Sequence, residues 1–229
     1  MSTDSKVWCS GGDNNHYGYN GDIMGINSNT TAHINCSHCL EKSSPAITQW
    51  EGIAYKEDTG LKEDHYTGYK FQCVEYARRW LINNMKCTFG DINHAAHIFE
   101  KISHVNDLIN ESKKLFQGFK NSNENFPKYG DLIIFPKFYG QPWGHVGVIT
   151  GVNPDKGYYE ISEQNNENYW EDPTSYARRL VMLYYEKQYT LTEIPWNENI
   201  IENIKNKGLE KEIASEGKSK ITGWKRIQE

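Results

Sequence analysis

The sequence predicts an α+β fold in which a helix that begins at Cys73 packs against an antiparallel sheet. Two observations support this prediction. Helical periodicity is concentrated in the first half of the chain and in a charged tail near its end. Between these regions, short runs rich in Val, Ile and aromatic residues are separated by turn residues. Helices followed by a block of successive strands are typical of α+β proteins.

The composition excludes several classes of protein. The 229 residues include 15 Tyr, 8 Phe and 7 Trp, which supply enough apolar area for a sizeable core. The net charge of −5, without clustered basic residues, predicts no binding to nucleic acid. No apolar run approaches the roughly 20 residues needed to span a bilayer, so we expect no membrane association. The mild acidic excess is compatible with a cationic ligand such as a polyamine.

Cysteine content and the start of the chain favour a cytoplasmic protein. Five cysteines without regular spacing argue against a disulfide framework. The first six residues lack the hydrophobic segment of a signal peptide. Residues 1–16 are polar and rich in Gly and Asn, so we expect a flexible extension there, followed by a single domain over residues 17–229.

A short extended piece, Ile23–Ile26, is followed by a segment that a metal could bind. Cys36 and Cys39 flank His38 closely, and Cys9 or His33 would complete four zinc ligands. A structural zinc site usually joins two ligand clusters, and the sequence has no second one. We therefore favour an insertion loop with incidental cysteines and expect no metal.

The central helix is predicted to begin at Cys73, after a turn at Gly68. Val74, Ala77 and Leu81 then follow at the spacing of one buried helical face. A thiol in the first helical turn lies at the positive end of the helix dipole, which favours the nucleophilic thiolate. The alternative is a small buried cysteine that packs like any apolar residue.

Further elements are predicted in chain order after this helix. Asp91 could cap a second helix from Ile92 to about Ile102, and a third helical piece covers Asp107 to Phe119. A surface loop over Asn121–Asn125 precedes the strands. The remaining elements are four strands within Gly130–Phe135, Trp143–Gly151, Gly157–Asn165 and Arg178–Tyr185, a weakly helical tail over Asn197–Glu216 and a last strand over Ile221–Ile227.

Three residues at the ends of these elements form a candidate catalytic triad. A cysteine nucleophile needs a base, and the base needs a third group that fixes its tautomer. His145 begins a strand, and Glu163 lies on the next one, within reach if the two strands pair as a hairpin. Asn165 is two residues further along and therefore on the same face. The alternatives are a core histidine at His145 and a surface carboxylate at Glu163.

These residues resemble the CHAP amidases of the papain-like superfamily, and among them the amidase domains of bifunctional glutathionylspermidine synthetase/amidase and of trypanothione synthetase. The resemblance implies a papain-like fold of the CHAP and NlpC/P60 type. It extends roughly over residues 17–226, and the synthetase half of those enzymes does not occur in this sequence, so we expect hydrolysis and not synthesis. The motifs that carry it are Gly68–Trp80, Gly144–Thr150 and Ser162–Asn165, with weaker matches at Gly18–Tyr19, Gly25–Ile26, Cys87–Phe89 and Gly223–Trp224.

The resemblance also implies a role for each matching residue. Cys73 would be the nucleophile, His145 the general base and Glu163 the residue that orients His145. No cofactor is implied. Contacts to the substrate would come from Gln72, Arg78 and Asn165 and from the backbone around Ile92, Asn93, His94 and Ala95.

Two features depart from the family pattern, and a third residue, Arg78, has an alternative role. The spacing from His145 to the acid is longer than in bacterial relatives, and His94 stands where a smaller or apolar residue is expected. Arg78 could instead form an ion pair with Glu75 three residues earlier. With the resemblance we favour a substrate contact for Arg78, and we expect Arg79 to be structural.

The reaction that the resemblance implies is hydrolysis of the amide between the glycine carboxyl of glutathione and spermidine, through a thioester on Cys73. The partner is then a small glutathione–polyamine conjugate. Two alternatives remain open. Another CHAP-type activity, such as peptidoglycan hydrolysis, would favour a secretion signal or a wall-binding repeat. A non-catalytic binder of the same conjugates would have no need of the triad.

Overall fold

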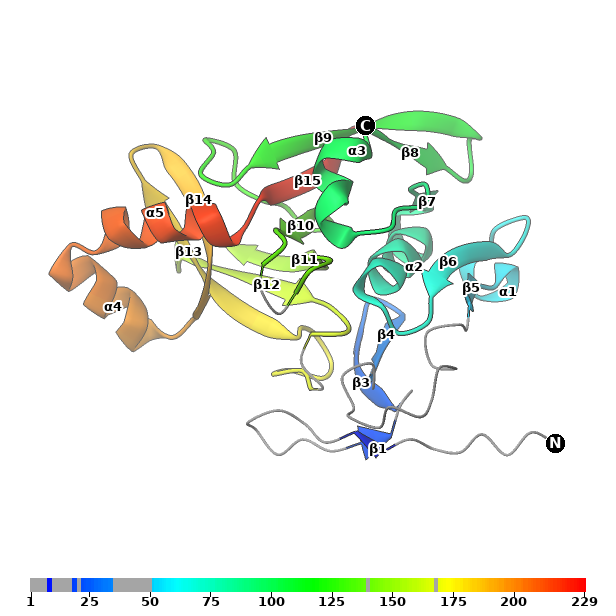
Figure 1. Ribbon diagram of the computed structural model, residues 1–229, viewed down its shortest axis with the longest axis horizontal. Helices are drawn as coiled ribbons and strands as arrows, with labels where there is room; N and C mark the ends of the chain where they lie inside the picture. Colours follow the sequence, from blue (N-terminus) through cyan, green and yellow to red (C-terminus); the bar gives the residue numbers. More distant parts are fainter. Residues whose placement is uncertain (1–7, 10–17, 20–21, 35–50, 139–140, 167–168) are drawn as a thin grey trace.

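The computed structural model describes residues 8–9, 18–19, 22–34, 51–138, 141–166 and 169–229. Within these residues a nine-stranded antiparallel sheet runs through the molecule in the order β14-β13-β12-β11-β10-β15-β9-β8-β7. Figure 1 shows β15, near the end of the chain, lying between β9 and β10. The strands are β7 (Cys87–Thr88), β8 (His104–Asp107), β9 (Ser112–Lys120), β10 (Leu132–Phe135), β11 (His145–Asn153), β12 (Tyr158–Ser162), β13 (Arg178–Tyr185), β14 (Gln188–Pro195) and β15 (Gly223–Ile227).

Short hairpins precede this sheet in the described part of the chain. The extended piece predicted at Ile23–Ile26 is part of β3. The pairs are β1 (Trp8–Cys9) with β2 (Gly18–Tyr19), β3 (Ile23–Asn27) with β4 (Thr30–His33), and β5 (Glu51–Ala54) with β6 (His65–Tyr69), the last enclosing helix α1 (Lys56–Thr59). Most of the expected extension over residues 1–16, and the loop with Cys36 and Cys39, lie outside the described residues.

The predicted central helix is confirmed as α2 (Cys73–Met85). Its buried face, which includes Tyr76, Trp80 and Leu81, packs on the same core as Leu132 of β10 and Val146 of β11. Neighbouring residues of β10 point the other way, into a second core around Tyr159 and Trp224. Because β10 is buried on both faces, its sequence is continuously apolar and does not alternate.

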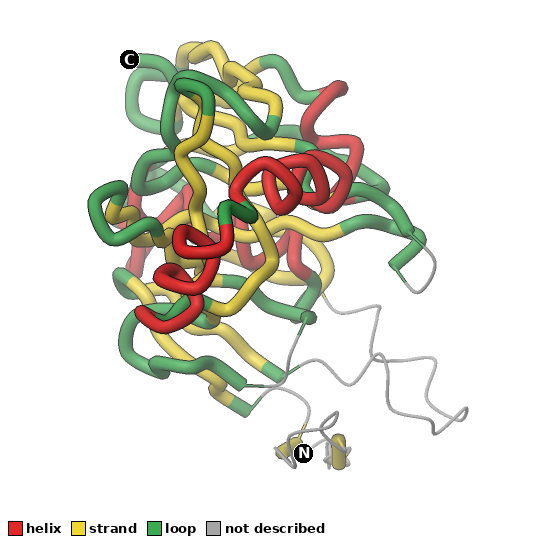
Figure 2. Tube along the Cα trace, turned by 90° about the vertical axis from the view of Figure 1, so that its left-hand side faces the viewer, coloured by secondary structure: helices red, strands yellow, loops and turns green. Residues whose placement is uncertain are grey.

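The charged tail forms two helices, as its weak periodicity predicts. They are α4 (Glu198–Lys207) and α5 (Glu210–Lys220). Asn197 caps α4, because its side chain accepts a hydrogen bond of 2.9 Å from the backbone N–H of Ile200. Figure 2, which faces the side where these helices lie, shows them in front of the sheet, and their apolar residues pack on Val181 and Leu183 of β13.

The prediction of a helix over Asp107–Phe119 is wrong, because this segment forms the β8–β9 hairpin. Phe116 and Phe119 are three residues apart, which also suits a helix, but both are buried by pairing of β9 with β15. Phe119 lies opposite Trp224, and the two rings stack with centroids 6.0 Å apart. Tertiary pairing overrides local periodicity here, as is common for short strands.

The helix predicted from Ile92 to Ile102 begins later than expected. The chain forms a 3₁₀ turn, η2 (Ala95–His97), which continues as α3 (Ile98–Lys101). Asp91 does not cap it, and the residue before the turn is His94. The strand β14 was not predicted, whereas the strands predicted within 130–135, 143–151, 157–165, 178–185 and 221–227 are all present. Among the described residues, no helix combines the length and apolar character required to cross a membrane.

Candidate active site

Cys73 is the first residue of α2, which follows a short turn at residues 70–71. The turn predicted at Gly68 is wrong, because Gly68 belongs to β6 and pairs with Gly52. Gly68 has φ of +124°, and a Cβ atom there would lie 3.1 Å from an Arg78 nitrogen, so this strand position requires glycine. Phe71 also adopts a positive φ of +65°. The Cys73 side chain is buried and lies where the free N–H groups of α2 and the helix dipole favour a negative charge.

His145 is held opposite this thiol as the first residue of β11. Gly144 precedes it with φ of +67°, and a Cβ atom there would lie 2.6 Å from the Cβ of Ala96. This close approach lets the segment that follows His94 pack directly against the start of β11, where the N–H of Ala96 donates to the carbonyl of Trp143 at 3.2 Å. His145 itself is 3% exposed.

The structure brings the three residues of the predicted triad together. Cys73 lies close enough to His145 for the imidazole to lower the pKa of the thiol. The Nε2 atom of His145 lies 2.7 Å from Oε2 of Glu163. Because Nε2 is engaged by the carboxylate, Nδ1 is the ring nitrogen left for Cys73. The predicted arrangement differs in one detail: β12 ends at Ser162, so Glu163 follows the strand, and Asn165 has a positive φ and does not continue the strand alternation.

The electrostatics of the triad favour a thiolate–imidazolium pair. Burial alone would raise the pKa of Cys73, but the charge and hydrogen bond of His145, with backbone N–H groups of Val146 and Val74, bring the pKa below its ordinary value of 9.0. Burial alone would lower the pKa of His145, but Cys73 and Glu163 together raise it to about 9. Each group therefore stabilises the charge of the other.

Glu163 is held by more than His145. Burial would raise its pKa, but the charge of Arg178, followed by that of His145, lowers it to about 2. Arg178 Nε lies 2.6 Å from Glu163 Oε1. The sequence reasoning did not assign a role to Arg178. One signal was present: Arg178 begins the predicted strand next to Glu163, and in the structure it lies opposite Ile161.

A cavity of about 780 Å³ opens onto Cys73 and His145. Six of the seven residues predicted to contact the substrate line it, while His94 does not and instead packs its ring against Trp143 with centroids 4.8 Å apart. The lining residues that were not predicted include Tyr66, Tyr69, Asp91, Gln141, Trp143 and Asn166. Those that were predicted are Gln72, Arg78, Ile92, Asn93, Ala95 and Asn165.

Two amides next to the triad are fixed by hydrogen bonds. Asn165 donates from Nδ2 to Oε1 of Gln72 at 2.9 Å. Gln164, which is fully buried, donates to the backbone carbonyl of Gln72 at 3.3 Å and to Oε2 of Glu75 at 3.2 Å. These contacts tie the segment after β12 to the residue that precedes Cys73, so the two halves of the site are held together.

Arg78 lines the cavity, but its guanidinium is largely used by the protein. It donates to three backbone carbonyls, those of Thr67 at 2.7 Å and of Phe89 and Gly90 at 3.1 Å. The alternative prediction, an ion pair between Arg78 and Glu75, is wrong, because Glu75 pairs instead with Arg79 at 2.7 Å. Arg78 therefore holds the wall of the cavity in place, and its contact with a substrate stays a prediction.

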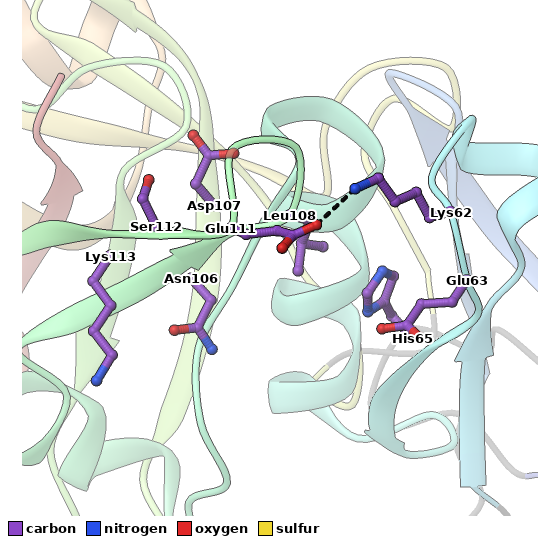
Figure 3. A pocket seen from close by; sticks show the side chains of 9 residues that line it. All are labelled: Lys62, Glu63, His65, Asn106, Asp107, Leu108, Glu111, Ser112 and Lys113. Atoms are coloured by element: carbon purple, nitrogen blue, oxygen red, sulfur yellow. Dashed lines mark hydrogen bonds and ion pairs between the residues drawn. The ribbon is translucent and has the colours of Figure 1, made fainter.

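A second cavity of about 490 Å³ lies away from the triad, between the loop after α1 and the β8–β9 hairpin. Figure 3 shows Lys62 and Glu111 joined across it by an ion pair of 2.6 Å. Both of these side chains are exposed, and no cysteine is among the described residues that line this cavity. Cys73 and His145 line the larger cavity and not this one.

The metal alternative rests on residues that the structure does not describe. Cys36, His38 and Cys39 all lie outside the described ranges. Within those ranges, no group of three or more His, Cys, Asp or Glu side chains is placed to hold a metal ion.

Residues 63–165 match the family model of the CHAP domain, a range that includes Cys73, His145 and Glu163. The chain contains a CHAP domain. A CHAP domain implies a papain-like fold, and the mixed α/β architecture with a mostly antiparallel sheet confirms the predicted fold class.

Curated relatives of this CHAP domain are much longer proteins. Trypanothione synthetase of Crithidia fasciculata is 34% identical over 137 residues, which cover 59% of this chain and 21% of that protein. Bifunctional glutathionylspermidine synthetase/amidase of Escherichia coli (strain K12) is 34% identical over 115 residues, which cover 48% of this chain and 18% of that protein. The Shigella flexneri enzyme of the same name gives the same values. The chain thus spans about a fifth of the length of the curated relatives it matches.

Proposed function

We propose that the protein is a thiol amidase that hydrolyses the amide between the glycine carboxyl of glutathione and spermidine. The observation that carries this proposal is the buried group of Cys73, His145 and Glu163 at the edge of a cavity of about 780 Å³, in which His145 is hydrogen-bonded to Glu163 and lowers the pKa of the Cys73 thiol. The volume of this cavity is in the range of small-molecule sites. The names of the curated relatives, which include a glutathionylspermidine synthetase/amidase, support the choice of substrate.

The first half of the reaction is acyl transfer to Cys73. The thiolate attacks the amide carbonyl carbon, and the electron pair of the C=O bond moves onto oxygen. The N–H of Cys73 points from the start of α2 and can donate to this oxyanion. Asn165 occupies the acceptor end of the Gln72 amide, which leaves the Gln72 NH₂ group available as a second donor.

His145 then supplies the proton that the leaving group needs. The C–N bond breaks as the imidazolium donates its proton to the departing amine, which gives free spermidine, a glutathionyl thioester on Cys73 and a neutral imidazole. The neutral ring next accepts a proton from water as the water oxygen attacks the thioester. The products are glutathione and the original thiolate–imidazolium pair. Glu163 stays ionised throughout and holds His145 in one tautomer.

The rim of the cavity favours a cationic leaving group. The carboxylate of Asp91 is 84% exposed there and lies 3.6 Å from a nitrogen of Arg78, which compensates part of its charge. Tyr66, Tyr69 and Trp143 also line the cavity and are exposed by 41%, 55% and 61%. Ammonium groups of a polyamine would gain from the carboxylate charge and from contact with the aromatic faces. A reducing compartment such as the cytoplasm, which keeps the thiol free, is proposed with this activity.

The test is incubation of the purified protein with glutathionylspermidine, followed by measurement of free spermidine. Cys73→Ala should abolish release. Cys87→Ala is the matched control, because Cys87 is also a buried free cysteine but does not line the cavity, and it should leave release unchanged. Peptidoglycan fragments, offered in parallel, should not be cleaved. No release of spermidine by the folded protein would refute the substrate assignment, and release that persists in Cys73→Ala would refute the mechanism.

A further inference from the structure

The carboxylate of Glu163 accepts hydrogen bonds from two residues on different sides. One is the catalytic histidine, and the other is Arg178. His145 Nε2 contacts Oε2 at 2.7 Å. Arg178, at the start of β13, donates from Nε to Oε1 at 2.6 Å and from a terminal nitrogen to Oε2 at 3.1 Å. The carboxylate is 3% exposed and the Arg178 side chain 19% exposed, so solvent screens this ion pair little. Asn166 adds a weaker contact to Oε1 at 3.2 Å.

The guanidinium of Arg178 contacts both carboxylate oxygens, and this bidentate pair (the Arg178 fork) fixes the orientation of the carboxylate. Two parallel N–H···O contacts to the two oxygens hold the carboxylate plane, which a single contact from His145 cannot do. Arg178 stands on a strand paired on both sides, by β12 and β14. Its guanidinium also lies 5.7 Å from the centre of the Phe135 ring, and this ring is 5.6 Å from that of His145. The arginine is therefore placed by the sheet itself.

The charges of the four neighbouring groups, from Cys73 to Arg178, alternate in sign. A thiolate at Cys73 is followed by the imidazolium of His145, the carboxylate of Glu163 and the guanidinium of Arg178. The groups that face His145 directly are Cys73 and Glu163. Behind them, Arg178 is also faced by Glu193 at 3.8 Å and by the buried Tyr159, and Glu171 lies further out. The positive charge of Arg178 offsets part of the field that Glu163 exerts on the histidine.

We propose that Arg178 is a positioning residue that aligns Glu163 and weakens the hold of its carboxylate on the proton of His145. An imidazolium next to an unopposed buried carboxylate is a poor acid, and His145 must give up its proton to the leaving amine. Arg178 therefore keeps His145 acidic enough to protonate the leaving group while it holds the tautomer in place. This role rests on the proposed amidase function.

The experiment measures two readouts on Arg178→Gln and Arg178→Lys. The first is the rate at which iodoacetate alkylates Cys73 as a function of pH. The carboxylate of this reagent is attracted to an imidazolium, so the rate falls at high pH when His145 loses its proton. The second readout is the turnover of glutathionylspermidine. Arg179→Gln is the matched control, because Arg179 is the next residue on β13 and pairs with Glu160 at 2.6 Å, away from the triad.

In Arg178→Gln we expect the basic limb of the alkylation profile to move upward by roughly one pH unit, since removal of a nearby positive charge raises the pKa of a histidine. Turnover should fall by at least tenfold. Arg178→Lys keeps the charge but loses the fork, so its basic limb should stay near that of the wild type while turnover falls roughly tenfold. A purely structural arginine would lower stability without moving the limb.

Three outcomes would overturn the proposal. An unchanged basic limb in folded Arg178→Gln refutes the electrostatic role. If that variant does not fold, wild-type turnover in Arg178→Lys refutes the alignment role by itself. The alkylation rate of wild-type Cys73 could instead rise with pH in a single step, as for an ordinary thiol, and show no fall at high pH. In that case the thiolate–imidazolium pair does not exist, and the proposed amidase mechanism fails together with the role of Arg178. The alkylation profile of the wild type thus separates the two failures.

Discussion

Replacement of Glu163 by Gln removes a buried charge but keeps the shape of the side chain. Burial would raise the pKa of Glu163, yet Arg178 and His145 lower it to about 2 from its ordinary 4.5. This lowered pKa corresponds to roughly 3 kcal/mol in favour of the ionised carboxylate in the folded protein. Because the folded pKa is the lower one, the stabilisation is fully present above pH 4.5 and is lost as the pH falls toward 2.

We therefore expect Glu163→Gln to lower the free energy of unfolding by roughly 3 kcal/mol at pH 7, which is in the range for breaking a buried ion pair. The difference from the wild type should shrink to roughly 1 kcal/mol at pH 3, where the wild type has itself lost most of this contribution. Turnover should fall by about 10² to 10⁴, because His145 loses the anion that sets its tautomer and stabilises its charge.

Urea unfolding at the two pH values, followed by circular dichroism, measures these differences. Glu160→Gln is the control, since Glu160 pairs with Arg179 in a more exposed position and should lose only about 1 kcal/mol, with turnover unchanged. A loss below about 1 kcal/mol for Glu163→Gln at pH 7, or a difference that does not shrink at pH 3, would show that the pair with Arg178 does not stabilise the fold as argued.

Three further outcomes are expected. The kcat/KM for glutathionylspermidine should fall as the pH rises through about 9, where His145 loses its proton, and a basic limb near pH 7 would contradict the pair with Cys73. Gly144→Ala should lower turnover at least tenfold and stability by roughly 2 kcal/mol in thermal melts, because its Cβ would lie 2.6 Å from Ala96, and wild-type turnover would contradict this. Arg78→Met leaves three backbone carbonyls without their donor and should cost roughly 3 kcal/mol in urea unfolding; a loss under about 1 kcal/mol would show that other groups satisfy them.

Local signals in the sequence were sufficient for much of the fold. The helix that begins at Cys73 could be predicted, because the spacing of its apolar residues is a signal that acts over a few residues. The strand that begins at His145 was predicted from the run rich in Val and Ile that follows it. The β8–β9 hairpin was mistaken for a helix, because the two phenylalanines of β9 are spaced for either structure until β15 pairs with that strand.

The sequence by itself determined the class of fold and which residues are the candidates for catalysis. Cys73, His145 and Glu163 were predicted because each stands at the end of an element with a local signature. Only the tertiary structure decided how these residues are held. Arg178 meets Glu163 because β13 pairs with β12, and a guanidinium has no local preference that reveals its partner. Ion pairs and hydrogen bonds between distant segments depend on strand pairing and burial, and neither is encoded in a short stretch of sequence.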